Sequence, residues 1–588
     1  MRYATTGLLL VIAIMLPCLA CGAPQQEQLG KTDELRIVVD KVLMKANGWV
    51  MTEDHVRQIA EAGFNVVSPR LGNKDMKQVR KVASAAQKHG IFHMPWMRGT
   101  HVAKTGPRMV WANGVEQDLC SPNGDELWNW MTGLITQYAK ISTEIPSLMG
   151  VFLDYENYSK DSQGNGYGLS YDDATMQMFA KAQAISLPSL AKDKRCPWLT
   201  EQGLNDEFES FQINHWRERC RALRKAVDSI NPRFQFCIYP APGTLFMEKA
   251  TWPEWATEQA PLIMADASTY GRPTGMMPHK EALAANRKTL EERMAFAMQS
   301  GHPMIYTGGI DPVVQGADPE FCGKNALMCA DATDGYWIFY EGPNVGQDHE
   351  EYWEWFTWAN RAIVAGEYDR QYETRETEDG WGVDKLVRKT DKLQLGWYGM
   401  KPRMPKMIQE TGKFEVHEVR GMSHDYLKEL DVIVLQNFNI ALEWDSEWVR
   451  TLRKYVEDGG ALMLAHDTAW FMASPFPEIA VKDYPTKKVE AERHVVETDL
   501  KVVAEHPSVA GVALNKPFPT EFRDHMIFKS GVDGTVVVEN LFGDPVYVAG
   551  AFGKGRVVFN GCYYGYRKDL SGMEEDLFLS MLDWLAGK

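Results

Sequence analysis

The sequence predicts an α/β protein, a (β/α)8 barrel (TIM barrel) followed by a second, flavodoxin-like α/β domain. Eight short apolar runs alternate with helical patterns over residues 33–368, which is the element order of a parallel barrel. A polar stretch without periodicity, 369–391, follows and is expected to be a linker. Residues 392–588 then return to strands and helices in a different order. An open, doubly wound sheet is the alternative arrangement for the first domain.

The eight expected barrel strands are short apolar runs that end in turn or polar residues, as buried strands do. They are 35–43, 65–69, 91–96, 149–154, 234–239, 262–266, 304–307 and 336–340. The expected helices have apolar residues at helical spacing, and several end at glycine. They are 53–62, with Thr52 as its cap, and 76–88, 214–230, 280–300 and 350–365.

The fourth expected strand ends in two carboxylates, Asp154 and Glu156. Side chains two residues apart in a strand share a face, so both are expected to point out of the end of the strand. Two carboxylates this close cannot both ionise freely, because each charge disfavours the other. We expect Glu156 to keep a proton and Asp154 to stay anionic, which is the division that glycosidic bond hydrolysis uses.

Polar or aromatic residues occur at the carboxyl end of every expected strand. In a barrel this rim carries the active site, and we expect these side chains to surround a common cleft. The residues are Asp40, Arg70, Trp96, Arg98, Asp154, Glu156, Tyr239, Asp266, Tyr270, Tyr306 and Glu341.

Residues 392–588 are expected to contain strands at 393–397, 414–418, 432–436, 461–466, 546–551 and 556–560, with helices at 447–457 and 574–586. The segment Asp431-Val-Ile-Val-Leu, the later Gly459-Gly-Ala-Leu-Met-Leu-Ala and the closing Gly553-Lys-Gly-Arg-Val-Val-Phe resemble class I glutamine-amidotransferase-like domains. Active members of that family have a cysteine nucleophile on the turn after the Gly-Gly-Ala-Leu strand. Here the turn reads Ala465-His466-Asp467-Thr468, so the resemblance implies a domain without amidotransferase activity.

A barrel followed by such a domain resembles family 42 β-galactosidases and related glycoside hydrolases in layout. In that family the second domain mediates oligomer contacts, so the resemblance implies a homo-oligomer formed through residues 392–588. The strand-four sequence Gly150-Val-Phe-Leu-Asp154-Tyr155-Glu156 also resembles the end of the family 18 chitinase-like signature. The two earlier acids of that signature are replaced here by Met149 and Phe152.

Together these features predict a carbohydrate-active hydrolase that needs no metal and no cofactor. Glu156 is expected to be the general acid/base, with Asp154 beside it and Asp266 as the partner carboxylate; Glu341 is a second candidate. A Glu expected on strand seven of a family 42-type enzyme is absent, since the chain reads Thr307-Gly-Gly-Ile-Asp311 there. The remaining rim residues and Trp337 are expected to bind sugar through hydroxyl contacts and ring stacking.

Two alternatives use the same residues. A barrel without a second catalytic acid would retain its cleft and aromatic residues as a glycan-binding protein. A metal-dependent hydrolase would need more ligands than His93 and His101, the two histidines near the expected rim.

The N-terminus predicts export. Arg2, an apolar run over 7–16 and the small residues near Cys21 are typical of a secretion signal over residues 1–22, and Cys21 is a candidate lipidation site that would tether the chain to a membrane. The net charge of −16 argues against a nucleic-acid partner. Two of the nine cysteines lie in the signal, and Cys322 with Cys329 is a candidate disulfide in an oxidising compartment.

Overall fold

The structure is a computed structural model. It describes residues 34–40, 50–100, 105–157, 161–164, 166–270, 279–311, 319–340, 349–373, 386, 388–401, 403–436, 438, 446–471, 474–483, 496–522, 524–565 and 569–587. The expected signal segment with Cys21, His101 and Glu341 lie outside the described residues.

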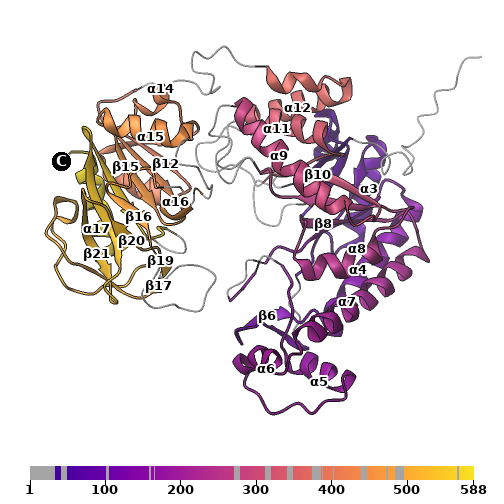
Figure 1. The fold of residues 1–588 in the computed structure, drawn as a ribbon. Helices are drawn as coiled ribbons and strands as arrows, with labels where there is room; N and C mark the ends of the chain where they lie inside the picture. Colours follow the sequence, from indigo (N-terminus) through magenta and orange to yellow (C-terminus); the bar gives the residue numbers. More distant parts are fainter. Residues whose placement is uncertain are drawn as a thin grey trace, which may run out of the picture.

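The first domain is a parallel barrel, as the sequence predicts (Figure 1). Its strands are β1 (Leu35–Asp40), β2 (Val66–Pro69), β3 (Phe92–His93), β4 (Trp96–Arg98), β7 (Gly150–Asp154), β8 (Gln235–Ala241), β9 (Leu262–Asp266), β10 (Met304–Ile310) and β11 (Gly335–Tyr340).

The strand pairing closes the sheet on itself. β1 pairs with β11 on one side and with β2 on the other, and all pairs are parallel. β3 and β4 are two halves of one expected strand: β3 pairs with β2, and β4 pairs with β7. A further bridge joins His93 to Leu148. The open-sheet alternative is therefore excluded, and the eight-stranded prediction is confirmed.

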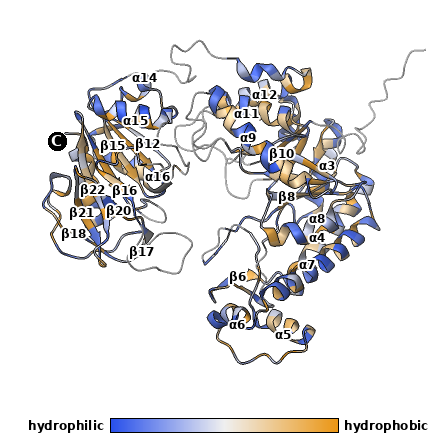
Figure 2. Ribbon diagram, in the orientation of Figure 1, coloured by the Kyte–Doolittle hydropathy of each residue, from blue (hydrophilic) through white to orange (hydrophobic). Residues whose placement is uncertain are grey.

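Helices cover the outside of the barrel (Figure 1). In chain order they are α2 (Glu53–Glu61), α3 (Met76–Lys88), α4 (Asp125–Glu144), α7 (Asn205–Asp228), α8 (Leu245–Trp255), α9 (His279–Met298), α11 (Pro319–Ala332) and α12 (His349–Ala365). Thr52 caps α2 as expected, because its side chain accepts from the His55 N–H. Most strands are apolar, whereas helices such as α7 are two-sided (Figure 2).

The barrel has two apolar cores separated by the sheet, because alternate strand residues face opposite sides. The lumen core includes Val39, Phe152, Cys237, Ile263 and Trp337. The outer core joins the other strand face to the helices and includes Val38, Leu153, Met264, Tyr306 and Ile338. Which core a strand residue belongs to therefore tells whether its side chain can reach the mouth.

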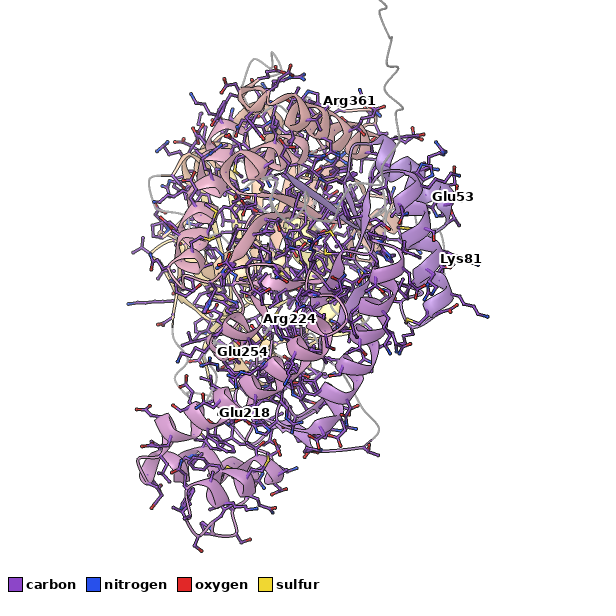
Figure 3. The ribbon with its side chains drawn as sticks, turned by 90° about the vertical axis from the view of Figure 1, so that its right-hand side faces the viewer. Glu53, Lys81, Glu218, Arg224, Glu254 and Arg361 are labelled. Carbon is purple, nitrogen blue, oxygen red and sulfur yellow. The ribbon has the colours of Figure 1, made fainter. Side chains whose placement is uncertain are left out.

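The helix layer is also joined by ion pairs. Glu254 of α8 accepts from Arg217 and Arg221 of α7, at 2.9 and 2.8 Å, and its side chain is only 7% exposed. Figure 3 shows Glu254 beside α7, which carries Glu218 and Arg224. This contact ties two neighbouring helices.

Two insertions were not expected from the sequence. A hairpin of β5 (Arg108–Val110) and β6 (Glu116–Cys120) precedes α4, and α5 (Asp173–Ala182) with α6 (Arg195–Glu201) precedes α7. A separate small apolar cluster holds the second insertion, with Val110, Phe179, Leu199 and Phe208 as members. The hairpin lies against the loop that follows β7, where Gln117 bonds to Asn157.

A short helical segment spans the expected boundary at residue 368. A short 3-10 helix, η3 (Tyr368–Tyr372), packs on α11, where Gln371 is buried and donates to Asp331. The Cys322–Cys329 disulfide is not formed. Neither residue is in a disulfide, and both lie on α11, two helical turns apart, which is too far for the short Cα separation that a disulfide requires.

The second domain is an α/β sheet in the order β13-β12-β14-β15-β23-β22-β21-β18. Five of its strands are parallel: β12 (Leu393–Tyr398), β13 (Phe414–Glu418), β14 (Val432–Gln436), β15 (Ala461–Ala465) and β23 (Gly555–Asn560). Three antiparallel strands extend the sheet beyond β23: β22 (Pro545–Phe552), β21 (Gly534–Asn540) and β18 (Leu500–Val502). The helices are α13 (Arg403–Glu410), α14 (His424–Leu427), α15 (Glu447–Glu457), α16 (Asp467–Phe471) and α17 (Met573–Leu585), and short strand pairs are β16 (Ala480–Lys482) with β20 (Phe528–Ser530) and β17 (Val496–Glu497) with β19 (Asp524–His525).

The turn after β15 is sharp and closed. His466 has a left-handed backbone (φ 46°) between the strand and α16, and its ring is 2% exposed against Phe522 and Tyr563. At the switch point between β12 and β14, where open α/β sheets bind ligands, Tyr398 and Phe438 pack together with centroids 5.4 Å apart.

No helix in the described ranges is both long and apolar enough to cross a lipid bilayer.

Candidate active site

The site is at the carboxyl ends of β4, β7 and β8, where the strand register brings three polar residues side by side. Asp154 ends β7 opposite Arg98 of β4 and opposite Tyr239 of β8. Phe152, two residues before Asp154, belongs to the lumen core, so Asp154 shares the lumen face. The Glu156 N–H donates to Asp154 Oδ1 at 2.8 Å, which folds the loop back over the strand end.

Asp154 is the carboxyl whose protonated form is favoured. Its pKa is raised from 3.8 to about 7, first by burial and then by the negative charge of Glu156, while the Glu156 N–H and the guanidinium groups of Arg98 and Arg70 oppose the rise. This direction is the opposite of the expectation that Asp154 stays anionic. Asp154 is 2% exposed whereas Glu156 is half-buried, and the more deeply desolvated carboxyl is the one whose charge is penalised.

Glu156 is held by a chain of two phenols. Tyr270 donates to the Tyr239 hydroxyl, and Tyr239 donates to Glu156 Oε1. Both tyrosine rings pack on Trp337, with centroid separations of 4.8 Å for Tyr239 and 5.7 Å for Tyr270. Trp337 is fully buried, so it forms the floor under the tyrosines and does not offer the open ring face that was expected of it.

A cation and two aromatic rings form another side of the mouth. The Arg70 guanidinium lies 5.0 Å from the Trp96 ring centre and 4.6 Å from that of Phe339. Contacts of this kind hold a guanidinium over a ring face. Arg98 is exposed and donates to the Glu156 carbonyl oxygen and to Thr100 Oγ1, both at 3.2 Å. The structure thus brings Arg70, Trp96 and Arg98 together with Asp154 and Glu156, as the sequence predicts.

Asp311 is a site residue that the sequence analysis missed. It follows β10 on the same strand face as Ile305, a lumen residue, and Gly309, where an added Cβ would lie 2.8 Å from the Trp337 ring. Asp311 is 4% exposed. The pKa of Tyr270 is raised well above its ordinary value by burial, then by Tyr239, Asp311 and Glu156 in that order. Tyr270 therefore has carboxylates from two different strands, Glu156 and Asp311, in its surroundings.

Asp266 and Tyr306 do not reach the mouth. Met264 and Tyr306 belong to the outer core, and Asp266 shares that face of β9. Asp266 Oδ2 accepts from Arg293 of α9 at 2.8 Å and from the Tyr306 hydroxyl at 2.5 Å. Asp266 was expected to be the partner carboxylate of Glu156, and Tyr306 to bind sugar. Both expectations are corrected, because the two side chains form a buried ion-pair cluster between strand and helix.

Two further predicted rim residues contribute no described side chain to the mouth. Asp40 ends β1, and the structure does not describe its side chain. His93 is fully buried, which lowers its pKa to about 3. Within the described residues, no cluster of three or more His, Cys, Asp or Glu side chains is placed to hold a metal ion.

Comparisons with known proteins give structural likenesses only. No protein-family model matches the chain, and no curated protein matches it. A β-galactosidase from Bacillus circulans sp. alkalophilus is similar over 95% of this chain and 88% of its own, at 12% identity and a TM-score of 0.41. A β-galactosidase from the psychrophilic Marinomonas ef1 is similar over 94% of this chain and 92% of its own, at 11% identity and a TM-score of 0.39.

An exo-β-1,4-mannosidase from Opitutaceae bacterium strain TAV5 covers 90% of this chain and 91% of its own, at 13% identity and a TM-score of 0.30. These scores are all below 0.5, so the fold rests on the strand pairing described above.

The inserted hairpin supports the loop that carries Glu156. The amides of Gln117 on β6 and Asn157 bond to each other in both directions, at 2.7 and 3.2 Å, and both side chains are buried. Trp111 Nε1 donates to Gln117 Oε1 at 2.9 Å and fixes the orientation of that amide. Glu156 is therefore fixed from three directions: by Tyr239, by Arg98 and by the hairpin through Asn157.

Proposed function

We propose that the chain is an exported glycoside hydrolase that cleaves glycosidic bonds of oligo- or polysaccharides by carboxylate acid–base catalysis. The observation that supports this best is the placement of Glu156 and Asp311 just after β7 and β10, with the charges of both acting on Tyr270. Hydrolysis of a glycosidic bond uses two carboxyl groups that flank the bond. The half-buried rings of Trp96 and Tyr270 suit a sugar ring.

In this proposal Asp154 holds one proton near neutral pH and passes it to Glu156, the more exposed member of the pair. Glu156 delivers that proton to the glycosidic oxygen while the bond to the anomeric carbon breaks. While Asp154 holds the proton, the pair does not carry two negative charges. Asp311 stabilises the positive charge that develops on the sugar, either by bonding to the anomeric carbon or by activating water.

The test is a screen of the mature protein against chromogenic glycosides and polysaccharides, followed by two variants. Glu156→Gln and Asp311→Asn are expected to lower kcat by about 10²–10⁴-fold, with the melting temperature nearly unchanged. Glu144→Gln, an exposed carboxylate on α4, is the matched control and should retain full activity. Azide should restore turnover in Asp311→Ala if Asp311 bonds to the sugar.

A protein that binds glycans but turns none of them over would contradict the proposal. It would leave the non-catalytic alternative, a glycan-binding protein on a barrel of this kind.

We further propose that residues 392–588 form an amidotransferase-like domain whose role is assembly. The packed switch point of Tyr398 and Phe438 and the enclosed His466 support a domain without its own substrate site. Sedimentation of the full chain, and of a chain with surface changes in this domain, tests a homo-oligomer. Mass spectrometry of the mature N-terminus tests cleavage near residue 22 and lipidation at Cys21.

A further inference from the structure

We infer that the mouth of the barrel contains a subsite for an anionic group, built on Arg98, so that the sugar it takes carries a carboxylate or a sulfate. This inference rests on the proposed function and names its substrate class. The chain as a whole is acidic, with a net charge of −16, so an acidic glycan needs a local cation to approach it.

Arg98 has donor capacity left for a ligand. A guanidinium has five N–H donors and no acceptor. Two of those of Arg98 are used, by the Glu156 carbonyl oxygen and by Thr100 Oγ1, each at 3.2 Å. Among the described residues both partners are neutral oxygens, so neither neutralises the positive charge. The side chain is exposed at the mouth, where an incoming group can reach it.

The position of Arg98 fits a ligand that also touches the carboxyl pair. Arg98 is opposite Asp154 in the β4–β7 register, and its Nη2 bonds to the backbone of Glu156. Trp96 lies two residues earlier on the same strand face and is half-buried. A sugar ring over Trp96 would therefore place a ring substituent near Arg98 while its glycosidic oxygen is near Glu156. Arg70, stacked on Trp96, adds a second positive charge on this side.

Electrostatics give a reason for an anion at this place. The positive charge of Arg98 opposes the protonation of Asp154, so an Arg98 without a bound anion favours the ionised form of that carboxyl. A substrate carboxylate or sulfate bound to Arg98 offsets that charge and favours the protonated form of Asp154. A neutral sugar cannot do so. The arrangement thus couples recognition of an acidic sugar to the protonated state that catalysis needs.

The experiment compares matched aryl glycosides that differ only at C6: glucuronide with glucoside, galacturonide with galactoside, and each 6-sulfated sugar with its parent. The native protein is expected to prefer an acidic member in kcat/KM. Arg98→Gln should reduce that preference by about ten- to hundredfold, the size of a charge-assisted hydrogen bond, and Arg98→Lys should retain part of it. Arg80→Gln, which removes a cation from the surface of α3, is the control and should change nothing.

The carboxylate and sulfate pairs distinguish the two sources of negative charge. An equal loss on acidic and neutral partners in Arg98→Gln would overturn the inference, because it would show that Arg98 only positions Glu156. Efficient hydrolysis of neutral glycosides alone would overturn it too, with the proposed hydrolase intact.

A binding measurement separates the inference from the proposed function. Calorimetry on Glu156→Gln with a uronic-acid disaccharide and its neutral analogue needs no turnover. Preferential binding of the acidic sugar that is lost in Glu156→Gln/Arg98→Gln supports the subsite even if the native protein hydrolyses nothing. Equal binding of the two sugars contradicts the subsite.

Discussion

At the scale of single residues, burial decides which carboxyl of the pair holds the proton. Asp154 and Glu156 lie on either side of Tyr155, yet only Asp154 is fully buried at the strand ends. Desolvation penalises the ionised form, so the deeper carboxyl is the neutral one. The Glu156 N–H, which bonds to Asp154 Oδ1, would by itself favour the opposite result, and burial outweighs it.

A pH–rate profile can test whether Asp154 holds the catalytic proton. Because Asp154 loses its proton near pH 7, the activity of the native protein should fall on the alkaline side of that pH. Asp154→Asn removes the group that holds the proton, so kcat should be lower and this alkaline limb should disappear. An unchanged alkaline limb in the variant would show that Asp154 does not supply the proton.

The same group makes stability depend on pH in a direction that can be checked. The native state holds the Asp154 proton up to about pH 7, whereas an unfolded chain loses it near pH 4. The native state therefore binds more protons between these values, and the free energy of unfolding should fall as pH rises through that window.

The Asp154→Asn variant tests this dependence because Asn cannot ionise and its Oδ1 can still accept from the Glu156 N–H. Thermal unfolding should give similar melting temperatures for both proteins at pH 4. At pH 8 the variant should be more stable, by up to about 4 kcal/mol, since each pKa unit corresponds to about 1.4 kcal/mol. A variant that is equally destabilised at both pH values would contradict the raised pKa of Asp154.

The phenol chain offers a separate test. Tyr239→Phe keeps the ring on Trp337 but removes the donor to Glu156, and we expect kcat to fall by about ten- to hundredfold, as for loss of a hydrogen bond to a charged group. Tyr336→Phe is the control, because its hydroxyl bonds to Asn360 in the helix layer. It should lower stability and leave kcat unchanged. A Tyr239→Phe variant with native kcat would exclude the phenol from the mechanism.

Much of the site could be predicted from where the strands end. The errors in that prediction share one physical cause. Asp266 and Asp154 both end apolar strands, but they are on opposite faces of the sheet. The position of a residue in the sequence shows where a strand ends. Whether its side chain faces the lumen or the helices is known only once the barrel is closed and one residue of the strand has been placed. Asp311 was overlooked because a Glu was sought on that strand, although its alternation with Gly309 and Thr307 was a usable signal.

At the scale of elements, the inserted hairpin is part of the site although it contributes no rim residue. Gln117→Leu should break the amide pair with Asn157 and leave the Asn157 amide without its buried partner. We expect kcat to fall by about tenfold or more while KM changes little, because Glu156 loses its alignment. The measurement is a KM–kcat comparison with the matched variant Gln137→Leu, an exposed glutamine on α4. An equal rise in KM alone would contradict a positioning role.

The elements that the sequence predicted are those with long, regular patterns. Strands β13 and β14 and helix α15 match their expected bounds because apolar runs and caps define them. The β5–β6 hairpin and the pairs β16–β20 and β17–β19 were not expected. They are two to five residues long, too short for a periodicity to stand out, and their pairing depends on contacts made across the chain.

At the scale of the whole molecule, the second domain is expected to have no glutaminase activity. The sharp turn after β15 is present, but it carries His466 in place of a thiol, and aromatic rings enclose that histidine. The full chain should release no ammonia from glutamine above the level of a blank. His466→Cys should also fail to release it, because the side chain remains enclosed. Ammonia release by the native chain would contradict this reading of the domain.

The seam between β1 and β11 pairs Leu35 with Gly335. During synthesis the first strand therefore has no partner on that side until about three hundred further residues have been made. Contacts between such distant parts of a chain form slowly, and a strand waiting for its neighbour exposes an edge that can pair with other chains. The barrel should consequently be the part of this protein that depends most on chaperones before it closes.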